Sequence, residues 1–312
     1  VLSNPEFLSE GTAVNDLRYP DRVLIGGDNF DAIRVLTEIY KSWVPEEKIL
    51  HTNIWSSELA KLTANAFLAQ RISSINSISA ICEATGADVR EVSRAIGTDS
   101  RIGSKFLDSG PGFGGSCFKK DILNLVYLAN FYGLQEVANF WESVVNINTW
   151  HQRRISQLVI KNLFGTLAGK KLVILGFAFK ANTNDTRESA AIQICKDFIN
   201  EGANLIIHDP KVNPQKIEED LGMKQFNKNT KNNYSESFNG LGSWIYSPGL
   251  DIFDNAYAVL VLTEWPDYAS LNWKEIAKKM IQPAWIFDSR SIVDAEKVKD
   301  AELNLWRVGD GS

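Results

Sequence analysis

The chain has 312 residues, with 33 lysines and arginines against 38 aspartates and glutamates and a formal net charge of −5. This length is enough for two domains with cores of their own, and the acidic balance excludes a general electrostatic attraction to nucleic acid or to an anionic membrane. Three cysteines and three histidines, far apart in the sequence, predict neither a disulfide framework nor a metal site.

Residues 1–53 are typical of the end of an α/β unit. Apolar residues at 22–27 and 48–52 predict two short strands, and residues 32–43 have helical spacing. Two strands are too few for a complete sheet, and the first residue is Val1 rather than methionine. We therefore expect a fragment or a processed product that retains only the end of its first α/β domain.

The middle of the chain, residues 54–163, is predicted to be entirely helical. A long helix should run from residue 56 to Gly86, the expected C′ residue, and the Asp88-x-x-Glu91 pattern is a capping box for a further helix. Residues 135–163 carry apolar side chains at helical spacing. Helices of this length can form a spine between domains or an interface between subunits.

Residues 164–312 predict a second α/β domain with a parallel sheet. A continuous apolar strand at 171–176 is followed by a helix that ends at Gly202 and by a strand at 205–209, which makes one βαβ unit. Further strands are expected at 258–262 and 285–288. The polar residues 222–250 between them predict a long surface excursion.

A glycine-rich segment, residues 110–115, leads through Ser116 and Cys117 into an amphipathic helix. Ser116 is the expected N-cap, so Cys117 would be the first helical residue, where unpaired backbone N–H groups and the macrodipole favour a thiolate. Asp121 lies one turn further on the same face. The pattern indicates an activated nucleophile beside a carboxylate, and the alternative is a buried apolar cysteine.

Two glycine motifs bear on ligand type. The spacing Gly110-x-Gly112-x-x-Gly115 matches a dinucleotide fingerprint, but residues 101–106 before it do not form a strand, so we expect these glycines to let the backbone approach a ligand. The turn at 176–180 has one glycine and ends in a lysine, which favours a nucleotide sugar or a phosphate over a dinucleotide. A plain strand-to-helix connection is the alternative.

Four blocks in this order resemble the UDP-glucose/GDP-mannose dehydrogenase family, and most closely its UDP-glucose 6-dehydrogenases: NPEFLSEGTA at 4–13, WSSELAKLTANAF at 55–67, FGGSCF at 113–118, and GFAFK at 176–180 with NDTRES at 184–189. The resemblance covers nearly the whole chain. It implies a remnant of an N-terminal NAD-binding Rossmann-like domain, a central helical dimerisation domain and a Rossmann-like UDP-binding domain. It also implies oxidation of UDP-glucose to UDP-glucuronate in two steps, with NAD as the cofactor.

The implied chemistry agrees with the residues. Oxidation of an alcohol beyond the aldehyde needs a tetrahedral adduct, and the resemblance gives Cys117 the thiohemiacetal and the thioester. Lys61 and Asn65 are four residues apart on one helical face, so both can point at one oxygen. By resemblance Lys61 stabilises the developing oxyanion with support from Asn65, while Asp121 and Glu6 serve the water and proton steps.

The resemblance also implies a set of ligand contacts. Arg101 is expected to reach the site of a neighbouring subunit, in a homo-oligomer that is at least a dimer. The substrate contacts fall on Glu6, Phe7, Leu8, Glu10, Lys61, Asn65, Arg101, the loop 108–114 with Phe113 and Gly114, Phe179, Lys180 and Arg290. The cofactor contacts fall on Glu10, Cys117 to Lys120, and Arg187, although Arg187 beside Asp185 also fits an ordinary exposed ion pair.

Other functions stay open at this point. A dehydrogenase for GDP-mannose or a UDP-N-acetylhexosamine would use the same cysteine chemistry, and a non-catalytic module could bind a UDP-sugar and oligomerise. A cysteine hydrolase lacks a histidine motif linked to Cys117. Because the chain begins after the family's Gly-x-Gly-x-x-Gly segment, we expect it to be inactive alone. Neither a spanning segment nor a signal peptide is seen, so we expect a cytoplasmic protein.

Overall fold

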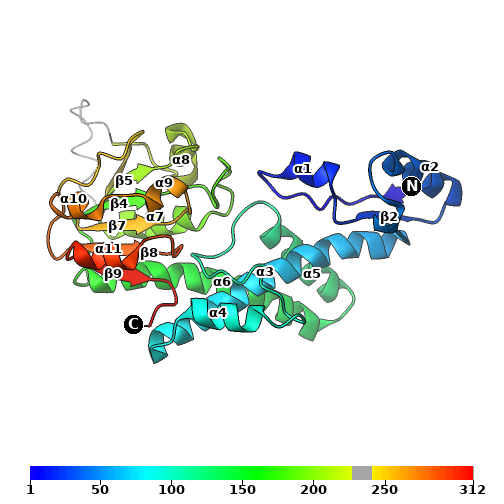
Figure 1. Cartoon of the computed structure of the whole chain (residues 1–312), viewed down its shortest axis with the longest axis horizontal. Coiled ribbons are helices and arrows are strands. Elements are labelled where there is room, and N and C mark those ends of the chain that lie inside the picture. Colours follow the sequence, from blue (N-terminus) through cyan, green and yellow to red (C-terminus); the bar gives the residue numbers. More distant parts are fainter. Residues whose placement is uncertain (227–240, 312) are drawn as a thin grey trace. The chain divides into compact units, whose positions relative to one another are not determined.

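A computed structural model describes residues 1–226 and 241–311 (Figure 1). The chain divides into two compact units, Val1–Ala69 with Cys117–Glu142, and Gln70–Ser116 with Ser143–Ser312. The division falls within helices α3 (Ile54–Thr85) and α6 (Gln135–Asn162) and just before α5 (Phe118–Phe131). In the part of the chain that the structure describes, no helix is long and apolar enough to cross a membrane.

The first unit opens with a three-stranded sheet in the order β1-β2-β3. Strand β2 (Val23–Gly27) pairs antiparallel with β1 (Leu2–Ser3) and parallel with β3 (Ile49–Thr52). Helix α2 (Phe30–Lys41) follows β2, after the short helix α1 (Ala13–Arg18) and before the 3₁₀ turn η1 (Glu46–Lys48). The two predicted strands and the predicted helix are confirmed, and α2 begins earlier because the Asn29 side chain caps it at Ala32 N, 2.9 Å away.

The predicted long helices are also confirmed. Helix α3 ends before Gly86, whose φ of +79° is the left-handed conformation that glycine adopts most easily. Helix α4 (Val89–Gly97) has Asp88 as its N-cap, as predicted. A capping box would have the Asp88 side chain accept the N–H of Glu91. In the structure, the Asp88 carboxylate instead accepts the N–H of Arg90, at 2.8 Å.

The N-cap of α5 differs from the prediction by one residue. The position falls on Cys117 rather than Ser116, and Phe118 is the first helical residue. The Cys117 carbonyl accepts the first intrahelical hydrogen bond, from Asp121 N at 2.9 Å, which is what defines the N-cap. Cys117 therefore lies at the N-terminus of the helix, still beside the N–H groups of its first turn.

The second unit contains a six-stranded sheet, and all of its strands are parallel. Their order is β6-β5-β4-β7-β8-β9. A parallel sheet is buried on both faces, which explains the continuous apolar run of the first strand. The strands are β4 (Lys171–Leu175), β5 (Asn204–His208), β6 (Ser243–Tyr246), β7 (Ala258–Val261), β8 (Trp285–Asp288) and β9 (Asn304–Arg307).

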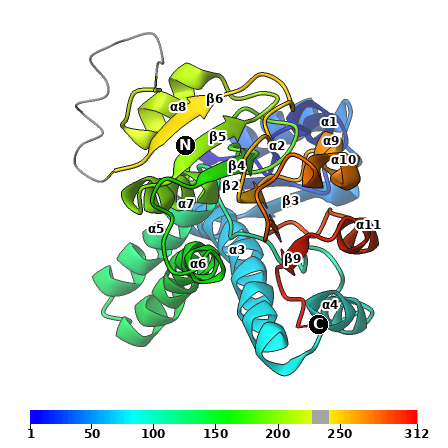
Figure 2. The same ribbon diagram turned by 90° about the vertical axis from the view of Figure 1, so that its left-hand side faces the viewer.

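Helices cover both faces of this sheet (Figure 2). Leu172 and Ile174 pack in a core with α6, α7 (Ala190–Asn200) and α8 (Pro214–Leu221). Val173 and Leu175 point the other way, into a core with α9 (Pro266–Ala269), α10 (Trp273–Ala277) and α11 (Ala295–Asp300). This alternation confirms the Rossmann-like doubly covered architecture.

The predicted excursion at 222–250 is partly wrong. Strand β6 adds to the edge of the sheet in parallel with β5, and Trp244 on it is fully buried opposite Leu205. The strand has only four residues and lies between glycine-containing segments, so its periodicity gave no clear signal. Its burial against the sheet stabilises it as a strand. The rest of that prediction lies at 227–240, outside the described residues.

Candidate active site

In the first unit, two helices bring a buried amide and a buried carboxylate together. Asn65 on α3 donates through Nδ2 to Oδ2 of Asp121 on α5, at 2.6 Å. Both residues are buried, with 9% and 5% of their surface exposed. The donor is a neutral amide, so the contact is a hydrogen bond and not an ion pair. Cys117 precedes Asp121 by one turn of the same helix.

Lys61, one turn before Asn65, meets a second carboxylate. Its Nζ lies 3.0 Å from Glu6 Oε1, and the Leu8 N–H donates to Glu6 Oε2 at 2.7 Å. Burial alone would raise the pKa of Glu6, but the hydrogen bonds from Leu8 and Lys61 outweigh it and hold that pKa below its ordinary value. Glu6 is therefore a carboxylate at neutral pH, and it holds the Lys61 ammonium in place.

The other predicted contacts of the first unit lie around these pairs. Lys120 Nζ is 4.0 Å from Asp121 Oδ1, and its side chain is 69% exposed. The Phe7 ring lies under the Arg22 guanidinium, 3.7 Å from the ring centroid, and 5.6 Å from Lys61 Nζ. Leu8 is exposed and Glu10 half-buried in the segment before α1.

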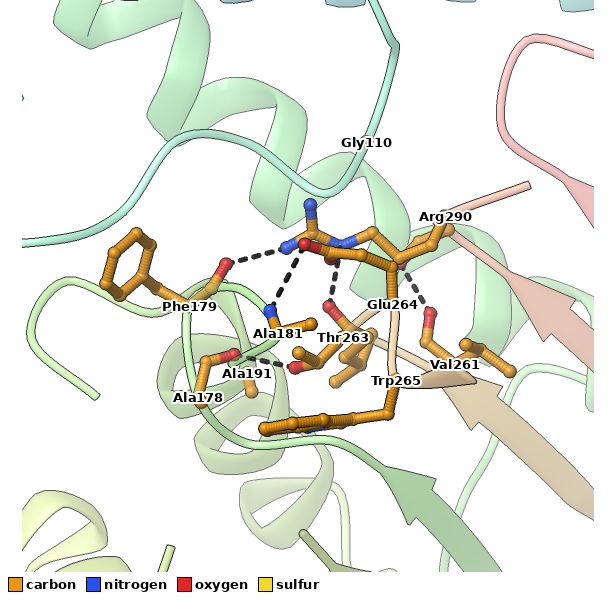
Figure 3. A network of polar contacts seen from close by, with 12 residues as sticks. Gly110, Ala178, Phe179, Ala181, Ala191, Val261, Thr263, Glu264, Trp265 and Arg290 are labelled. Carbon is orange, nitrogen blue, oxygen red and sulfur yellow. Dashed lines mark hydrogen bonds and ion pairs between the residues drawn. The ribbon is translucent and has the colours of Figure 1, made fainter. Parts of the chain in front are cut away.

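In the second unit, Arg290 forms hydrogen bonds with the segments that follow two neighbouring strands, at their carboxyl ends (Figure 3). Its Nη2 donates to Phe179 O, which follows β4, at 2.8 Å, and its Nε donates to Leu262 O, which follows β7, at 2.9 Å. This edge is where parallel α/β sheets bind their ligands. The predicted residues Phe179 and Arg290 are thus brought together.

Glu264 is a member of this network that the sequence analysis did not single out. Its Oε2 is ion-paired with Arg290 Nε at 3.1 Å, and its Oε1 accepts the Ala181 N–H at 3.2 Å. Thr263 beside it donates to Ala178 O at 2.6 Å. The sequence offered one signal for Thr263 and Glu264, which is their position directly after a buried strand. Polar residues at the carboxyl ends of parallel strands lie at the edge of the sheet where ligands bind.

Asp209, at the end of β5, was also missed. It is fully buried, and its Oδ2 accepts the N–H groups of Phe177 at 2.7 Å and Ala178 at 3.0 Å, with Trp265 Nε1 at 3.3 Å. A dinucleotide fold presents the N–H groups of its first strand-to-helix turn to a pyrophosphate. Here the chain's own carboxylate takes them. This favours the interpretation of the 176–180 turn as something other than a dinucleotide site.

The predicted substrate loop packs directly on the segment after β4. A Cβ atom on Gly114 would lie 2.6 Å from Glu188 O and 2.8 Å from Phe179 Cβ, so no larger residue fits without a backbone shift. Gly115 donates to Arg187 O at 2.7 Å, and a Cβ there would lie 3.2 Å from the Phe179 ring. These glycines allow close approach of the chain's own backbone, and approach to a ligand stays a prediction.

Three family models match consecutive parts of the chain, and together they span most of it. The NAD binding domain of the UDP-glucose/GDP-mannose dehydrogenase family matches residues 1–44, the central domain matches 55–150, and the UDP binding domain matches 173–295. The chain belongs to the UDP-glucose/GDP-mannose dehydrogenase family. The resemblance inferred from four sequence blocks is confirmed.

Relatives within this family share about half of their residues with the chain. UDP-glucose 6-dehydrogenase of Drosophila melanogaster is 50% identical over 315 residues, which cover 99% of this chain and 64% of that protein. The Gallus gallus protein of the same name is 54% identical over 301 residues, which cover 94% and 59%. The chain thus spans less than two thirds of the length of these relatives.

Solved structures of family members share the fold. A UDP-glucose dehydrogenase from Pyrobaculum islandicum superposes with a TM-score of 0.80 at 29% identity, and the match covers 100% of this chain and 64% of that one. A UDP-D-ManNAc dehydrogenase from Pyrococcus horikoshii gives 0.76 at 23% identity over 100% of this chain and 65% of that one.

The remaining positions that the family resemblance predicts are exposed or occupied by local contacts. Arg101 is 87% exposed and paired with Asp99, and Arg187 is 59% exposed and paired with Asp185, each at 2.6 Å. Lys180 Nζ lies 5.5 Å from the Phe179 ring centroid. The Phe113 side chain is buried, with 6% exposed.

Proposed function

We propose that this chain carries the catalytic cysteine and the sugar-nucleotide site of an NAD-dependent dehydrogenase that oxidises UDP-glucose to UDP-glucuronate. The observation that carries the proposal is a group of residues in the first unit. Cys117 is the N-cap of α5, and Asp121 follows one turn later and is hydrogen-bonded to Asn65. Lys61, paired with Glu6, lies one turn from Asn65. The relatives named UDP-glucose 6-dehydrogenase support the choice of substrate.

In this proposal the residues act in three stages. Once the sugar C6 is an aldehyde, Cys117 Sγ bonds to it, and the carbonyl electron pair moves to the oxygen, where Lys61 and Asn65 stabilise the charge. After the second oxidation the adduct is a thioester. Asp121 or Glu6 takes a proton from water, the resulting hydroxide adds to the thioester carbon, and the C–S bond breaks to leave the carboxylate and the Cys117 thiolate.

NAD, when bound, would accept the hydride of each oxidation. The residues assigned to it fit an anionic dinucleotide, because Lys120 and Arg187 present cationic side chains that are 69% and 59% exposed. Glu10 and the backbone of residues 117–120 complete the proposed contacts.

The proposal is tested first by thiol reactivity. We expect iodoacetamide to modify Cys117 faster than Cys82 and Cys195, which are buried and serve as internal controls. UDP-glucose should slow the modification of Cys117, as measured by peptide mass spectrometry. If Cys117 were modified at the same rate with and without UDP-glucose, it would not lie at the sugar site.

Turnover is tested in a polypeptide of the relatives' full length that contains this chain. Two NADH should form per UDP-glucose, and GDP-mannose and UDP-N-acetylhexosamines should be poorer substrates. Faster oxidation of one of those sugars would assign the chain to a neighbouring activity. Binding of UDP-glucose without any NADH would assign it to a non-catalytic module.

We also propose that the chain self-associates through its central helices. An apolar groove of about 550 Å³ lies in the first unit, and Trp55 and Tyr132 on it are 66% and 59% exposed. A surface of this kind usually marks an interface. A monomer by light scattering at micromolar concentration would contradict the proposal. The groove is lined by Trp55, Ser56, Glu58, Leu59, Leu62, Thr63, Leu125, Leu128, Ala129, Tyr132, Leu134, Val137 and Trp141.

The cytoplasmic location stays a prediction. Cys82 and Cys195 are buried free cysteines, which suits a reducing compartment.

A further inference from the structure

We propose that Asn76, Asn148 and His151 are positioning residues that fix the substrate loop at 110–114 for UDP-sugar binding. The family resemblance assigned none of them. The inference rests on the proposed function and adds the residues that set the shape of its sugar-nucleotide site.

Gly110 is held through both of its backbone polar groups, which lie on the two peptide planes that flank its Cα atom. Its N–H donates to Asn76 Oδ1 at 2.9 Å, and its carbonyl lies 2.8 Å from His151 Nε2. Asn76 comes from α3 and His151 from α6, and both side chains are fully buried. Rotation of either peptide would break one of these hydrogen bonds and leave a buried side chain without its partner, which is costly.

Phe113 is held by a single side chain that pairs with both of its backbone groups. Asn148 Oδ1 accepts the Phe113 N–H at 2.8 Å, and Asn148 Nδ2 donates to Phe113 O at 3.1 Å. Asn148 is 6% exposed. Gly112 between the two fixed residues has a φ of +119°, and a Cβ there would lie 2.8 Å from Asn148 Oδ1. The contact therefore requires glycine at 112.

The state of His151 follows from its partner. A carbonyl oxygen only accepts hydrogen bonds, so Nε2 must carry the proton and donate to Gly110. Burial, helped by the charge of Arg154, lowers the pKa of His151 to about 4, while the Gly110 carbonyl and Glu83 oppose this. Arg154 and Glu83 are themselves ion-paired at 2.7 Å. At neutral pH, His151 is thus a neutral donor, and among the described residues its Nδ1 has no partner.

The fixed loop lies against the binding edge of the sheet. A Cβ on Gly110 would lie 3.4 Å from Arg290 Nη1, and Figure 3 shows the Gly110 segment beside the Arg290 guanidinium. The far end of the loop packs on Phe179 through Gly114 and Gly115. Holding Gly110 and Phe113 therefore sets the space between the loop and Arg290. A loop ordered before binding spares the ligand the entropy cost of ordering it.

The first test compares two substitutions of His151 in the 312-residue chain. His151→Leu removes the donor, whereas His151→Gln keeps an N–H that can reach Gly110 O. Calorimetric titration with UDP-glucose at pH 7.5 should give about tenfold weaker binding for the leucine variant, or roughly 1.4 kcal/mol, and about wild-type binding for the glutamine variant. Gln157→Leu, at an exposed position of α6, is the matched control and should bind normally.

The second test reads the loop itself without ligand. Hydrogen exchange should be accelerated more at the Gly110 amide in His151→Leu, and at the Phe113 amide in Asn148→Ala, than at the amides of strand β4. An equal acceleration at the loop and throughout the sheet would mean that the substitution lowers global stability alone, and it would overturn a positioning role. If His151→Leu does not fold, Asn148→Ala provides both the binding and the exchange measurement.

The outcomes separate this inference from the proposed function. If the unchanged chain does not bind UDP-glucose, the proposed function fails and the inference fails with it. If the unchanged chain binds and His151→Leu binds equally well, only the inference is overturned. Equal losses in the leucine and glutamine variants would also overturn it, because the donor would then be irrelevant.

Discussion

The residues proposed for catalysis and those that shape the proposed ligand edge are held by different kinds of contact. In the first unit, charged side chains meet one another near the surface, as in the Lys61–Glu6 pair, in which the two side chains are 19% and 56% exposed. In the second unit, buried neutral side chains such as Asn148 and His151 bind backbone atoms. Among the residues proposed for catalysis, Asn65 and Asp121 are the pair that combines burial with a neutral donor.

The difference follows from what each group has to do. A residue that moves protons needs access to water or substrate, and its exposed ion pairs contribute little stability, typically below about 1 kcal/mol. A residue that shapes a binding edge has to stay in place, and loss of a buried hydrogen bond leaves a partner unsatisfied at about 1–3 kcal/mol. Mutations of the exposed ion pairs in the first unit should therefore reduce turnover with little effect on folding, and mutations of the buried hydrogen-bonding side chains in the second unit should affect both ligand binding and folding.

The largest effect is expected for Cys117→Ser in a polypeptide of full length. Steady-state NADH formation should fall by roughly 10³-fold or more, as with loss of other catalytic nucleophiles. UDP-glucose binding should persist, and any acyl adduct should accumulate as a slowly hydrolysed ester, because an alkoxide leaves less readily than a thiolate. Near-normal formation of two NADH per sugar would mean that the thiol is structural.

Lys61→Ala should come next, with a loss of about 10²–10³-fold in turnover, the usual value of one preorganised donor to a developing oxyanion. Single-turnover NADH yield should fall from two towards one per sugar, because the oxyanion that Lys61 stabilises forms when Cys117 adds to the aldehyde, after the first oxidation. The unfolding free energy should change by less than about 1 kcal/mol because the pair with Glu6 is partly exposed. Glu6→Gln is the matched variant, and a large stability loss in either would contradict the comparison.

His151 should make the unfolding free energy depend on pH. Its pKa is about 4 when folded and 6.5 when unfolded, so between these values the unfolded chain binds a proton that the folded chain does not. Stability is therefore complete above pH 6.5 and falls as the pH drops towards 4, by about 3 kcal/mol from this residue. Urea unfolding of wild type and His151→Gln should differ by this slope. If the unfolding free energies of the two proteins changed with pH in parallel, His151 would not have a lowered pKa in the folded chain.

The smallest effect is expected for Arg187→Ala. Arg187 is 59% exposed and paired with Asp185, so the unfolding free energy should change by less than about 1 kcal/mol. NAD binding should weaken if Arg187 meets the cofactor, as the family resemblance implies. Arg153→Ala, another exposed arginine, is the control. Unchanged NAD affinity would reduce Arg187 to an ordinary surface ion pair.

Local patterns were enough to predict most elements of the chain. Continuous apolar runs identified β4 and β7, and helical spacing identified α3 and α6. The prediction missed β6 and placed the N-cap of α5 on Ser116. Both errors occur where the local signal is weak: a four-residue strand between glycine-containing segments, and a helix end that one hydrogen bond decides.

For the proposed site, the sequence alone determined the residues whose chemical type is distinctive at their position. These include Cys117 before a helix, Asp121 one turn later, and Lys61 with Asn65 on one helical face, because short-range geometry fixes such relations. Only the tertiary structure showed that Asn65 reaches Asp121, and that Asn76, Asn148 and His151 converge on the loop at 110–114. Polar side chains on long helices carry no local signal of what they contact, since their partners lie 34 to 56 residues away in the chain.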